Sequence, residues 1–335
     1  MTFRHALLAA YALGAASLAA AHHSPAMFDM TTTVVIEGTV KKVVWGNPHT
    51  YMEIETVDAG GQPVVQNVEA GPTAVLFTGG VTTDSVRAGE RVTLRAAPHR
   101  RGPGNTVLGL ELTKADGTAL PLHVRAIRAP ARTDAIATSI AGTWVSRSPE
   151  FVNFGDVLRA SQLTDAGRAA RASSKAAADA ARSTCVPYGP PPLMLLPVAT
   201  VVETSDEAVT FALDWMNARR VVHLNAEHPR DLEPSLLGHS IGRWEGGALI
   251  VDTVGFTAQA EGLAFDFPSS AAKHVRERFA VAAGGKQLDY EVTVEDPEYF
   301  AAPITYRAQW DYRPEQQSSG MACDPKLAAQ FTQDE

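Results

Sequence analysis

The chain has 335 residues, of which 45% are hydrophobic and 20% charged, and its formal net charge is −8. This is the composition of a globular protein, and the length predicts two domains of ordinary size. An acidic chain without blocks of basic residues is a poor partner for nucleic acids or anionic membranes, so no nucleic-acid partner is expected.

The first 21 residues have the pattern of a secretory signal peptide. Arg4 precedes an apolar stretch that is too short to span a membrane, and Ala19 and Ala21 form a small-residue cleavage site. We therefore expect a periplasmic or secreted protein whose mature chain begins at His22 or, with cleavage one residue earlier, at Ala21. No later segment is apolar enough to span a bilayer, so no integral membrane contact is expected.

Either mature terminus would chelate a metal ion. A terminal His22 offers its amine and its imidazole, and an Ala21-His22-His23 terminus offers a planar set of nitrogens that suits Cu(II). His49, which follows Asn47-Pro48 at the end of a strand, would complete a three-histidine set for copper or zinc. The alternatives are solvated terminal histidines and a turn histidine at position 49 that bonds a neighbouring carbonyl group.

Residues 22–125 are predicted to form a small OB-like β domain. Strands are expected at residues 33–45, 50–57, 62–69, 90–97 and 106–112, with a short helix at 72–78. Gly60-Gly61 separates the second and third segments and predicts a hairpin. About five strands and one helix in such a short segment are typical of an OB-like barrel.

Residues 126–140 are predicted to be a linker and residues 141–335 a second β domain. An alanine-rich segment at 158–181 predicts a helix capped near Thr164, and the prolines from Pro187 onward end it. Hairpins follow at 208–225, 240–256 and 274–295, with a last strand at 304–312. A meander of about eight antiparallel strands favours a closed barrel, because closure removes exposed edges.

Cys185 and Cys323 are the two cysteines of the chain. Their separation excludes a C-x-x-C metal or redox motif. In an oxidising compartment two thiols in one domain usually pair, so a Cys185–Cys323 disulfide is expected. The alternative is two free thiols.

Long motifs in both halves resemble known families. H-H-S-x-A-x-F-D, which begins at His22, and E-G-T-V-x-x-V-x-W-x-N-P-H, which begins at Glu37, are similar to an exported bacterial family of unknown function. The segment from Leu236 to Phe256 resembles a lipocalin-like barrel domain, also of unknown function, and Gly142-Thr143-Trp144 matches the G-x-W that opens many lipocalin-type barrels. The resemblance implies export and a mainly β fold, and it implies no reaction.

Several predicted strands of the second domain contain charged residues among residues that are otherwise apolar enough to be buried. We predict one lumen-facing polar cluster in which Arg243 pairs with Asp252. The candidate catalytic residues are His239, Asp252, His274, Glu277 and Glu291. The candidate ligand-binding residues are Arg243, Trp244, Trp144, Phe256 and Tyr290. The alternative is that the charges form solvated ladders on the outside of the barrel.

The sequence contains no nucleophile elbow, dinucleotide fingerprint, phosphate-binding loop or H-E-x-x-H motif. The expected function is therefore binding of a small apolar or lipid-like molecule in the barrel. One alternative is an enzyme of the isomerase, hydratase or cyclase type that uses acid/base chemistry in that pocket. The other is a copper-binding protein that uses its N-terminal histidines, and copper is the one cofactor expected.

Overall fold

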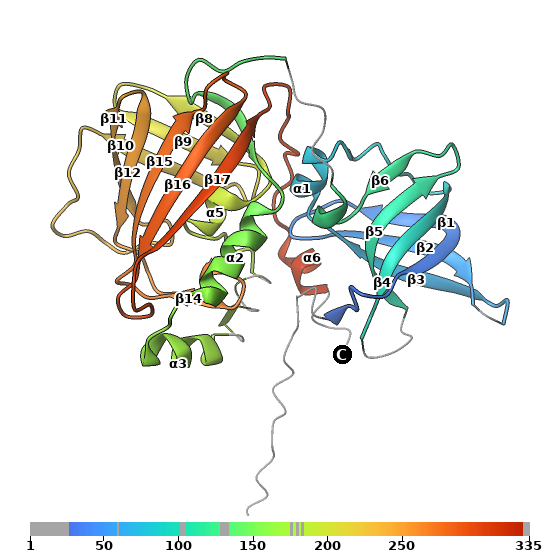
Figure 1. Cartoon of the computed structure of the whole chain (residues 1–335). Helices are drawn as coiled ribbons and strands as arrows, with labels where there is room; N and C mark the ends of the chain where they lie inside the picture. Colours follow the sequence, from blue (N-terminus) through green and yellow to red (C-terminus); the bar gives the residue numbers. More distant parts are fainter. Residues whose placement is uncertain are drawn as a thin grey trace, which may run out of the picture.

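The computed structural model describes residues 27–58, 60–100, 105–127, 134–174, 177–178, 181 and 184–330. Two β domains lie side by side, and the C-terminal segment runs between them (Figure 1). The predicted mainly β fold, with a smaller barrel followed by a larger one, is confirmed. The predicted cleavage site at Ala21 and the histidines His22 and His23 lie outside the described residues.

The elements of the first domain are β1 (Val34–Val44), β2 (Thr50–Val57), β3 (Pro63–Ala70), α1 (Thr73–Thr78), β4 (Arg91–Pro98), β5 (Thr106–Lys114) and β6 (Ala119–Pro121). The strands are ordered β3-β2-β1-β4-β5-β6, and parallel pairing of β3 with β5 closes the barrel. The core inside is apolar, with Met52, Ile54 and Leu94 fully buried. This is the small OB-like barrel that the strand pattern predicts.

Strand β1 bends so that it can pair with two neighbours. Its first half pairs with β4 and its second half with β2, with a bulge between Val40 and Lys42. A bulge bends a strand and increases its twist. Gly38 lies where the backbones come closest, because a Cβ atom there would lie 2.3 Å from the carbonyl oxygen of Glu55. Closure of the small barrel therefore depends on a glycine and a bulge within one strand.

The strands of the second barrel are β7 (Gly142–Ser146), β8 (Ala199–Thr204), β9 (Ala208–Leu213), β10 (Arg219–Leu224), β11 (His239–Glu245), β12 (Ala248–Val254), β15 (His274–Val281), β16 (Gln287–Glu295) and β17 (Ile304–Tyr312). They form a closed barrel in the order β10-β11-β12-β15-β16-β17-β7-β8-β9. Between β12 and β15 the chain forms a separate two-stranded sheet, β13 (Gln259–Ala264) with β14 (Phe267–Ser269).

The predicted antiparallel meander is wrong at one pair of strands. Strands β10 and β11 are parallel, with Val222 opposite Ser240. Parallel neighbours need a long crossover connection, and residues 225–238 supply it. The crossover has no strand pattern of its own, so it could not be predicted from the sequence. Its consequence is that His228 is carried over the outside of the barrel.

Local turn chemistry accounts for the predicted hairpins. Met216 and Asn217 lie within the connection from β9 to β10, residues 214–218, with φ values of 50° and 55°. Gly246 and Gly247 alone join β11 to β12, with φ values of 54° and 83°. Type I′ turns require positive φ at both central positions. The predicted hairpins around these two turns are confirmed.

Within the segment at 158–181 predicted to be helical, the structure has α3 (Asp165–Ser173), and residues 177–178 and 181 are also helical. Thr164 Oγ1 accepts a hydrogen bond from the backbone N–H of Gly167 at 3.0 Å, which confirms the predicted cap. Helix α2 (Glu150–Ala160), whose residues Phe151, Phe154 and Leu158 form one buried face, was not predicted, and a short α5 (Pro192–Leu195) follows α3. None of the helices in the described part of the chain has the length and apolarity needed to cross a membrane.

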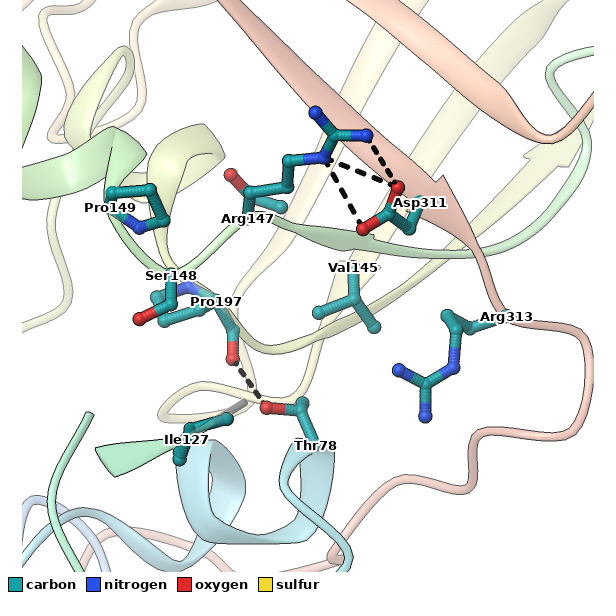
Figure 2. Close-up of a pocket in the computed structure, with 10 residues that line it drawn as sticks. Thr78, Ile127, Val145, Arg147, Ser148, Pro149, Pro197, Asp311 and Arg313 are labelled. Atoms are coloured by element: carbon teal, nitrogen blue, oxygen red, sulfur yellow. Dashed lines mark hydrogen bonds and ion pairs between the residues drawn. The ribbon is translucent and has the colours of Figure 1, made fainter. Parts of the chain in front are cut away.

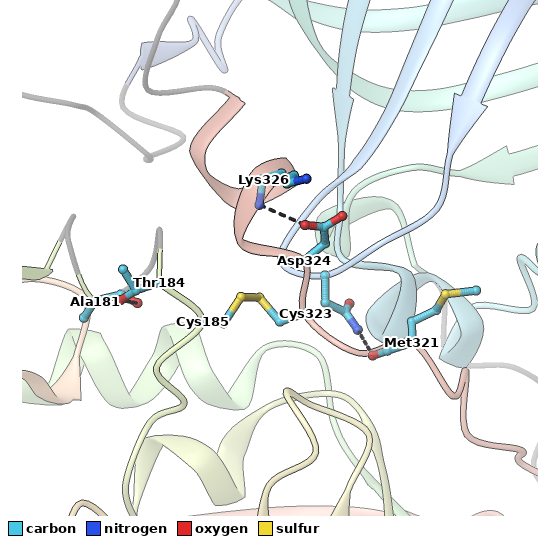
Figure 3. Close-up of a disulfide and its surroundings, with 8 residues drawn as sticks. Ala181, Thr184, Cys185, Met321, Cys323, Asp324 and Lys326 are labelled. Carbon is cyan, nitrogen blue, oxygen red and sulfur yellow. Dashed lines mark hydrogen bonds between the residues drawn. A yellow bond between two sulfur atoms is a disulfide. The ribbon is translucent and has the colours of Figure 1, made fainter.

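The C-terminal segment ties the two domains together. After β17 the chain runs to the first domain, where Asn47 Nδ2 donates to the carbonyl oxygen of Met321 at 2.9 Å and α6 (Pro325–Gln330) follows. Cys323 in this segment forms the predicted disulfide with Cys185 of the second domain, with Cα atoms 5.8 Å apart (Figure 3). The disulfide therefore anchors to the second domain a segment that also contacts the first.

Candidate functional site

The wall of the second barrel separates its charged side chains into two groups. On β12, Val251 and Thr253 are buried inside, whereas Asp252 between them is half-buried on the outside. On β15, Glu277 is buried inside and His274 lies on the outer face. The prediction of one lumen-facing cluster is therefore corrected to two clusters on opposite faces of the barrel wall. The reason is that successive side chains along a strand point to opposite faces.

Inside the barrel, Arg220 and Glu277 form a fully buried ion pair. Arg220 Nη1 lies 2.9 Å from Glu277 Oε1, and the same guanidinium donates to Ser240 Oγ at 3.2 Å and to Thr253 Oγ1 at 2.9 Å. Tyr290 donates to Glu277 Oε1 at 2.9 Å. Burial, the largest single influence, would lower the pKa of Arg220, but the charge and hydrogen bonds of Glu277, together with the charge of Tyr290, outweigh burial and raise it. The predicted catalytic Glu277 and ligand-binding Tyr290 thus belong to a closed, fully partnered network.

Aromatic rings fill the rest of the lumen. The ring of Phe279 lies 4.9 Å from that of Tyr290 and 5.8 Å from that of Trp310, measured between centroids. Trp144, a predicted ligand-binding residue, is fully buried and donates its indole N–H to the carbonyl oxygen of Ile140 at 2.8 Å. Binding of an apolar or lipid-like molecule in the lumen stays a prediction, and this packing does not favour it.

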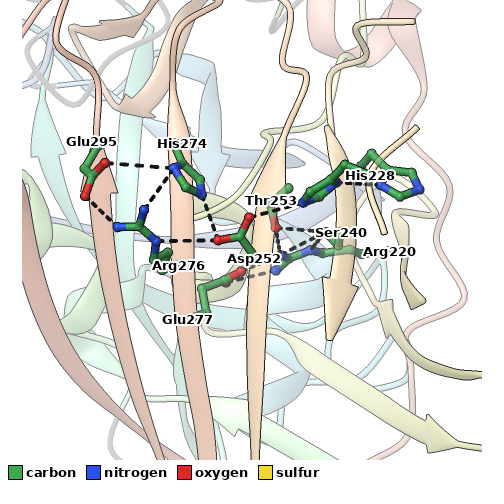
Figure 4. A network of polar contacts seen from close by, with 10 residues as sticks. Arg220, His228, Ser240, Asp252, Thr253, His274, Arg276, Glu277 and Glu295 are labelled. Carbon is green, nitrogen blue, oxygen red and sulfur yellow. Dashed lines mark hydrogen bonds and ion pairs between the residues drawn. The ribbon is translucent and has the colours of Figure 1, made fainter. Parts of the chain in front are cut away.

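Outside the barrel, a histidine–aspartate cluster consists of His223, His228, His239, Asp252 and His274. Figure 4 shows Asp252 between His274 and His228. Asp252 Oδ1 lies 2.8 Å from His274 Nε2, and Oδ2 lies 3.1 Å from His228 Nε2. His228 Nδ1 lies 2.9 Å from His239 Nδ1, and the rings of His239 and His223 stack at 5.2 Å. The structure therefore brings together three predicted catalytic residues, His239, Asp252 and His274.

Sequence reasoning missed the two other members of this cluster. His228 lies in the crossover between β10 and β11, where no periodicity indicates a position. His223 did carry a signal, because alternation along β10 places it on the face opposite Arg220. This alternation alone could not place His223 beside His239, because that also requires β10 and β11 to be neighbouring strands.

The electrostatics of the cluster favour an ionised carboxylate at Asp252 and a neutral ring at His239. Burial would raise the pKa of Asp252, but the hydrogen bonds and charges of His274 and His228 outweigh burial and lower it. Burial, followed by the nearby His228 and His223, lowers the pKa of His239. His239 is therefore neutral at pH 7, and neutral imidazole nitrogens can act as bases or as metal ligands.

Arg243 does not pair with Asp252 as predicted. In the register of the hairpin Ile241 lies opposite Asp252, and Arg243 lies opposite Ile250. The guanidinium of Arg243 instead lies 2.6 Å from a carboxylate oxygen of Glu245 on its own strand. Both side chains are exposed, so this pair belongs to the solvated surface.

The remaining predicted barrel residues do not meet at one site. Glu291 pairs with Arg307 at 2.5 Å on the outer face. Trp244 is 45% exposed, whereas Phe256 is buried beneath the ammonium group of Lys273, which lies 4.2 Å from the ring centroid. Glu291 and Arg243 instead form ion pairs with exposed neighbours, as in the alternative interpretation that the charges lie on the solvated outer surface of the barrel.

In the first domain, His49 contacts a carboxylate. His49 Nδ1 lies 3.1 Å from Glu69 Oε1, and burial raises the pKa of Glu69 to about 7. Burial also lowers the pKa of the nearby His123 to about 4. Among the residues that the structure describes, no three histidine, cysteine or acidic side chains are arranged to hold a metal ion. Because His22 and His23 lie outside those residues, the three-histidine set stays a prediction.

A cavity of about 260 Å³ lies where the two domains meet (Figure 2). Its apolar walls are Ile127, Val145, Pro149 and Pro197, and its polar wall residues are Thr78, Ser146, Ser148, Arg147, Asp311 and Arg313. Thr78 of α1 closes it from the first domain and donates to the carbonyl oxygen of Pro197 at 3.2 Å. Sequence reasoning did not predict this cavity, because its walls come from segments far apart in the chain.

The lining of this cavity has more positively charged than negatively charged side chains. Arg147 Nη2 lies 3.0 Å from Asp311 Oδ1, and Arg313 pairs with Glu315, which does not line the cavity. The lining therefore has two arginines and one carboxylate. The hydroxyl of Ser146 is buried and has no hydrogen-bond partner within the described part of the chain. Such a group costs about 1–3 kcal/mol if it stays unpaired, so a ligand or water that reaches it gains a hydrogen bond.

Residues 11–108 match the model of a family of unknown function, DUF6152. The match ends within β5 of the first domain and leaves the second barrel uncovered. The predicted resemblance of the first half of the chain to a family of unknown function is confirmed over these residues. No curated protein matches the chain. The family description names no activity, so the functional argument depends on the geometry of the sites.

Proposed function

We propose that this chain is an exported protein that binds a small organic acid in the cavity between its two domains. The observation that carries the proposal is the lining of that cavity, in which Arg147 and Arg313 face a single carboxylate, Asp311, among apolar walls. Ligand sites often lie at domain interfaces, in apolar pockets with a few convergent polar groups. Export is supported by the Cys185–Cys323 disulfide, since such bonds persist in oxidising compartments.

The charge and depth of the two arginines favour an anionic group. The side chain of Arg313 is 12% exposed and that of Arg147 is 28% exposed. A guanidinium binds a carboxylate through two parallel hydrogen bonds, and partial burial strengthens such a contact. Asp311 already occupies one edge of Arg147, and Glu315 and Gln316 accept from Nε and Nη2 of Arg313. A ligand carboxylate would therefore bind the more deeply buried Arg313 through Nη1, or would displace Glu315.

The volume limits the ligand to a small molecule. Drug-sized ligands occupy pockets of about 300–1,000 Å³, and the cavity volume of about 260 Å³ lies just below that range, which favours a small ligand. Ile127 and Val145 supply apolar wall for the carbon skeleton. The proposal keeps small-molecule binding from the sequence but moves it from the lumen to the domain interface.

Acid/base catalysis at the histidine–aspartate cluster is the second candidate function. The convergence of His239, Asp252 and His274 favours it, because an ionised carboxylate orients two imidazole rings there. The cavity between the two domains has a defined volume and lining, whereas the cluster is described only by its side-chain contacts, which ranks this candidate below ligand binding.

Thermal unfolding of the mature protein in the presence of small carboxylic acids tests the proposal. We expect one or more small mono- or dicarboxylates to raise the melting temperature, and the matching alcohols and amides to have no effect. Isothermal titration should then show that Arg313→Ala weakens binding at least about tenfold, the loss of one charge-assisted contact. Arg307→Ala is the matched control, because Arg307 is exposed and pairs with Glu291 on the outer face.

Ser146→Ala separates binding from folding. Removal of an unpaired buried hydroxyl should leave the free energy of unfolding unchanged or raise it. The same change should weaken binding if the ligand uses that hydroxyl. The proposal fails if no acid shifts the melting temperature, or if an acid binds the Arg147→Ala/Arg313→Ala protein as tightly as the wild type.

A further inference from the structure

Two imidazole nitrogens face each other on the outside of the second barrel. His228 Nδ1 and His239 Nδ1 are 2.9 Å apart, and the two rings are inclined by 69°. The other nitrogen of His228, Nε2, lies 3.1 Å from a carboxylate oxygen of Asp252. A carboxylate accepts hydrogen bonds, so this contact places an N–H on Nε2 of His228 and leaves Nδ1 as the nitrogen that faces His239.

We infer that His228 and His239 bind one Cu(II) ion through their Nδ1 atoms. This site is distinct from the interdomain cavity and from the N-terminal histidines. On binding, the ion takes the place of the single proton between the two nitrogens. His239 keeps its proton by moving it to Nε2, so no net proton is released when both rings are neutral.

The contact between Asp252 and His228 is typical of metal-bound histidine. A histidine that ligates a metal almost always donates its other ring N–H to a carboxylate, carbonyl or water, which sets the ring orientation and makes the ligating nitrogen more basic. Asp252 makes that contact to His228 and is itself held by His274 at 2.8 Å. The supporting residues around His228 are thus in place.

The donor set suits copper. Two imidazole nitrogens with water at the remaining positions fit the tetragonal coordination of Cu(II). The nitrogens are 2.9 Å apart, close enough for one ion with metal–nitrogen bonds of about 2.0 Å to contact both. Because no three protein donors converge within the described residues, water would complete the coordination.

Charge and access also suit a cation. The side chain of His228 is 21% exposed and that of Asp252 is 29% exposed, so an ion reaches the site from solvent without a channel. Glu295 and Asp252 flank one arginine, Arg276, so these three side chains carry one negative charge in excess beside the rings. An ion, unlike an organic substrate, needs no cavity.

Copper titration of the untagged full chain tests the inference, in a His22→Ala/His23→Ala background that removes the N-terminal chelate. We expect one equivalent of Cu(II) to bind, with an electron paramagnetic resonance spectrum that shows coupling to two imidazole nitrogens. His228→Ala and His239→Ala should each weaken binding at least about tenfold. Asp252→Asn should weaken it about 10–100-fold without changing the number of ligating nitrogens. His99→Ala, in the other domain, is the matched control.

Circular dichroism should show that each variant is folded, since these side chains are part-exposed and contribute little to the core. The inference is overturned if the background protein takes up no copper. It is also overturned if the His228→Ala/His239→Ala variant binds Cu(II) as tightly as the background. Because no organic acid enters this test, its result is independent of the proposed ligand cavity.

Discussion

The two faces of the second barrel wall use the same residue types in opposite ways. Inside, Arg220 and Glu277 have side chains that are 1% and 0% exposed, and each charged atom has a partner. Outside, Asp252 lies between His274 and His228 with its side chain 29% exposed. A single residue step along β12 or β15 moves a side chain from one environment to the other.

The difference shows that a charged residue in a β strand does not by itself indicate a functional site. A buried pair whose partners are all present is a closed structural unit, and removal of one partner leaves an uncompensated charge. A part-exposed cluster gains little from its ion pairs but keeps its nitrogens accessible. Accessibility therefore distinguishes the cluster around Asp252 from the network around Glu277.

Loss of the inner charge should have the largest effect. Glu277→Gln leaves Arg220 charged and buried without a counter-ion, so we expect it to lower the free energy of unfolding by about 3–5 kcal/mol. Urea denaturation measures this change. Glu291→Gln is the matched control on the outer face, where loss of the pair with Arg307 should cost no more than about 1 kcal/mol. If the two substitutions lowered the free energy of unfolding equally, the proposed difference between the inner and outer faces would be wrong.

A smaller effect is expected from the phenol that completes the inner network. Tyr290→Phe removes the hydrogen bond to Glu277 Oε1 but leaves the pair with Arg220 intact. A hydrogen bond to a charged group contributes about 1.5–3 kcal/mol, so we expect a loss of about 2 kcal/mol in urea denaturation. A loss below about 0.5 kcal/mol would mean that Tyr290 serves only to fill space in the lumen.

The smallest effect is expected on the outer face, and it should depend on pH. The folded-state pKa of Asp252 is lowered, so its contribution to stability is present above the unfolded pKa of about 3.9 and is lost as pH falls through the folded value. Unfolding midpoints measured from pH 6 down to pH 3 should therefore fall less steeply for Asp252→Asn than for the wild type. A steeper fall in the variant would contradict the assignment of an ionised Asp252.

Features with local causes were predictable from the sequence. The turns at Met216-Asn217 and Gly246-Gly247, the cap at Thr164 and most strands of both barrels follow from neighbouring residues alone. Helix α2 also had its signal in the spacing of Phe151, Phe154 and Leu158, and it was missed. The resemblance of the first half to a family of unknown function was predictable because long motifs carry it.

The candidate sites were predictable only in part. Asp252 and His274 share a side of the barrel wall because alternation along paired strands requires it. Their partner His228 comes from a crossover that exists only because β10 and β11 are parallel. The cavity at Arg147 and Arg313 needs both domains in contact, and no sequence pattern records that contact.

The sequence by itself determined which side chains of each strand share a face, because the two-residue repeat is a property of the extended backbone. Only the tertiary structure decided which face became the lumen, since that depends on the closure of β10-β11-β12-β15-β16-β17-β7-β8-β9 into one barrel. Closure enclosed Glu277 with Arg220 and left Asp252 outside. The physical reason is that burial is a sum over contacts between distant segments, whereas alternation is set within a single strand.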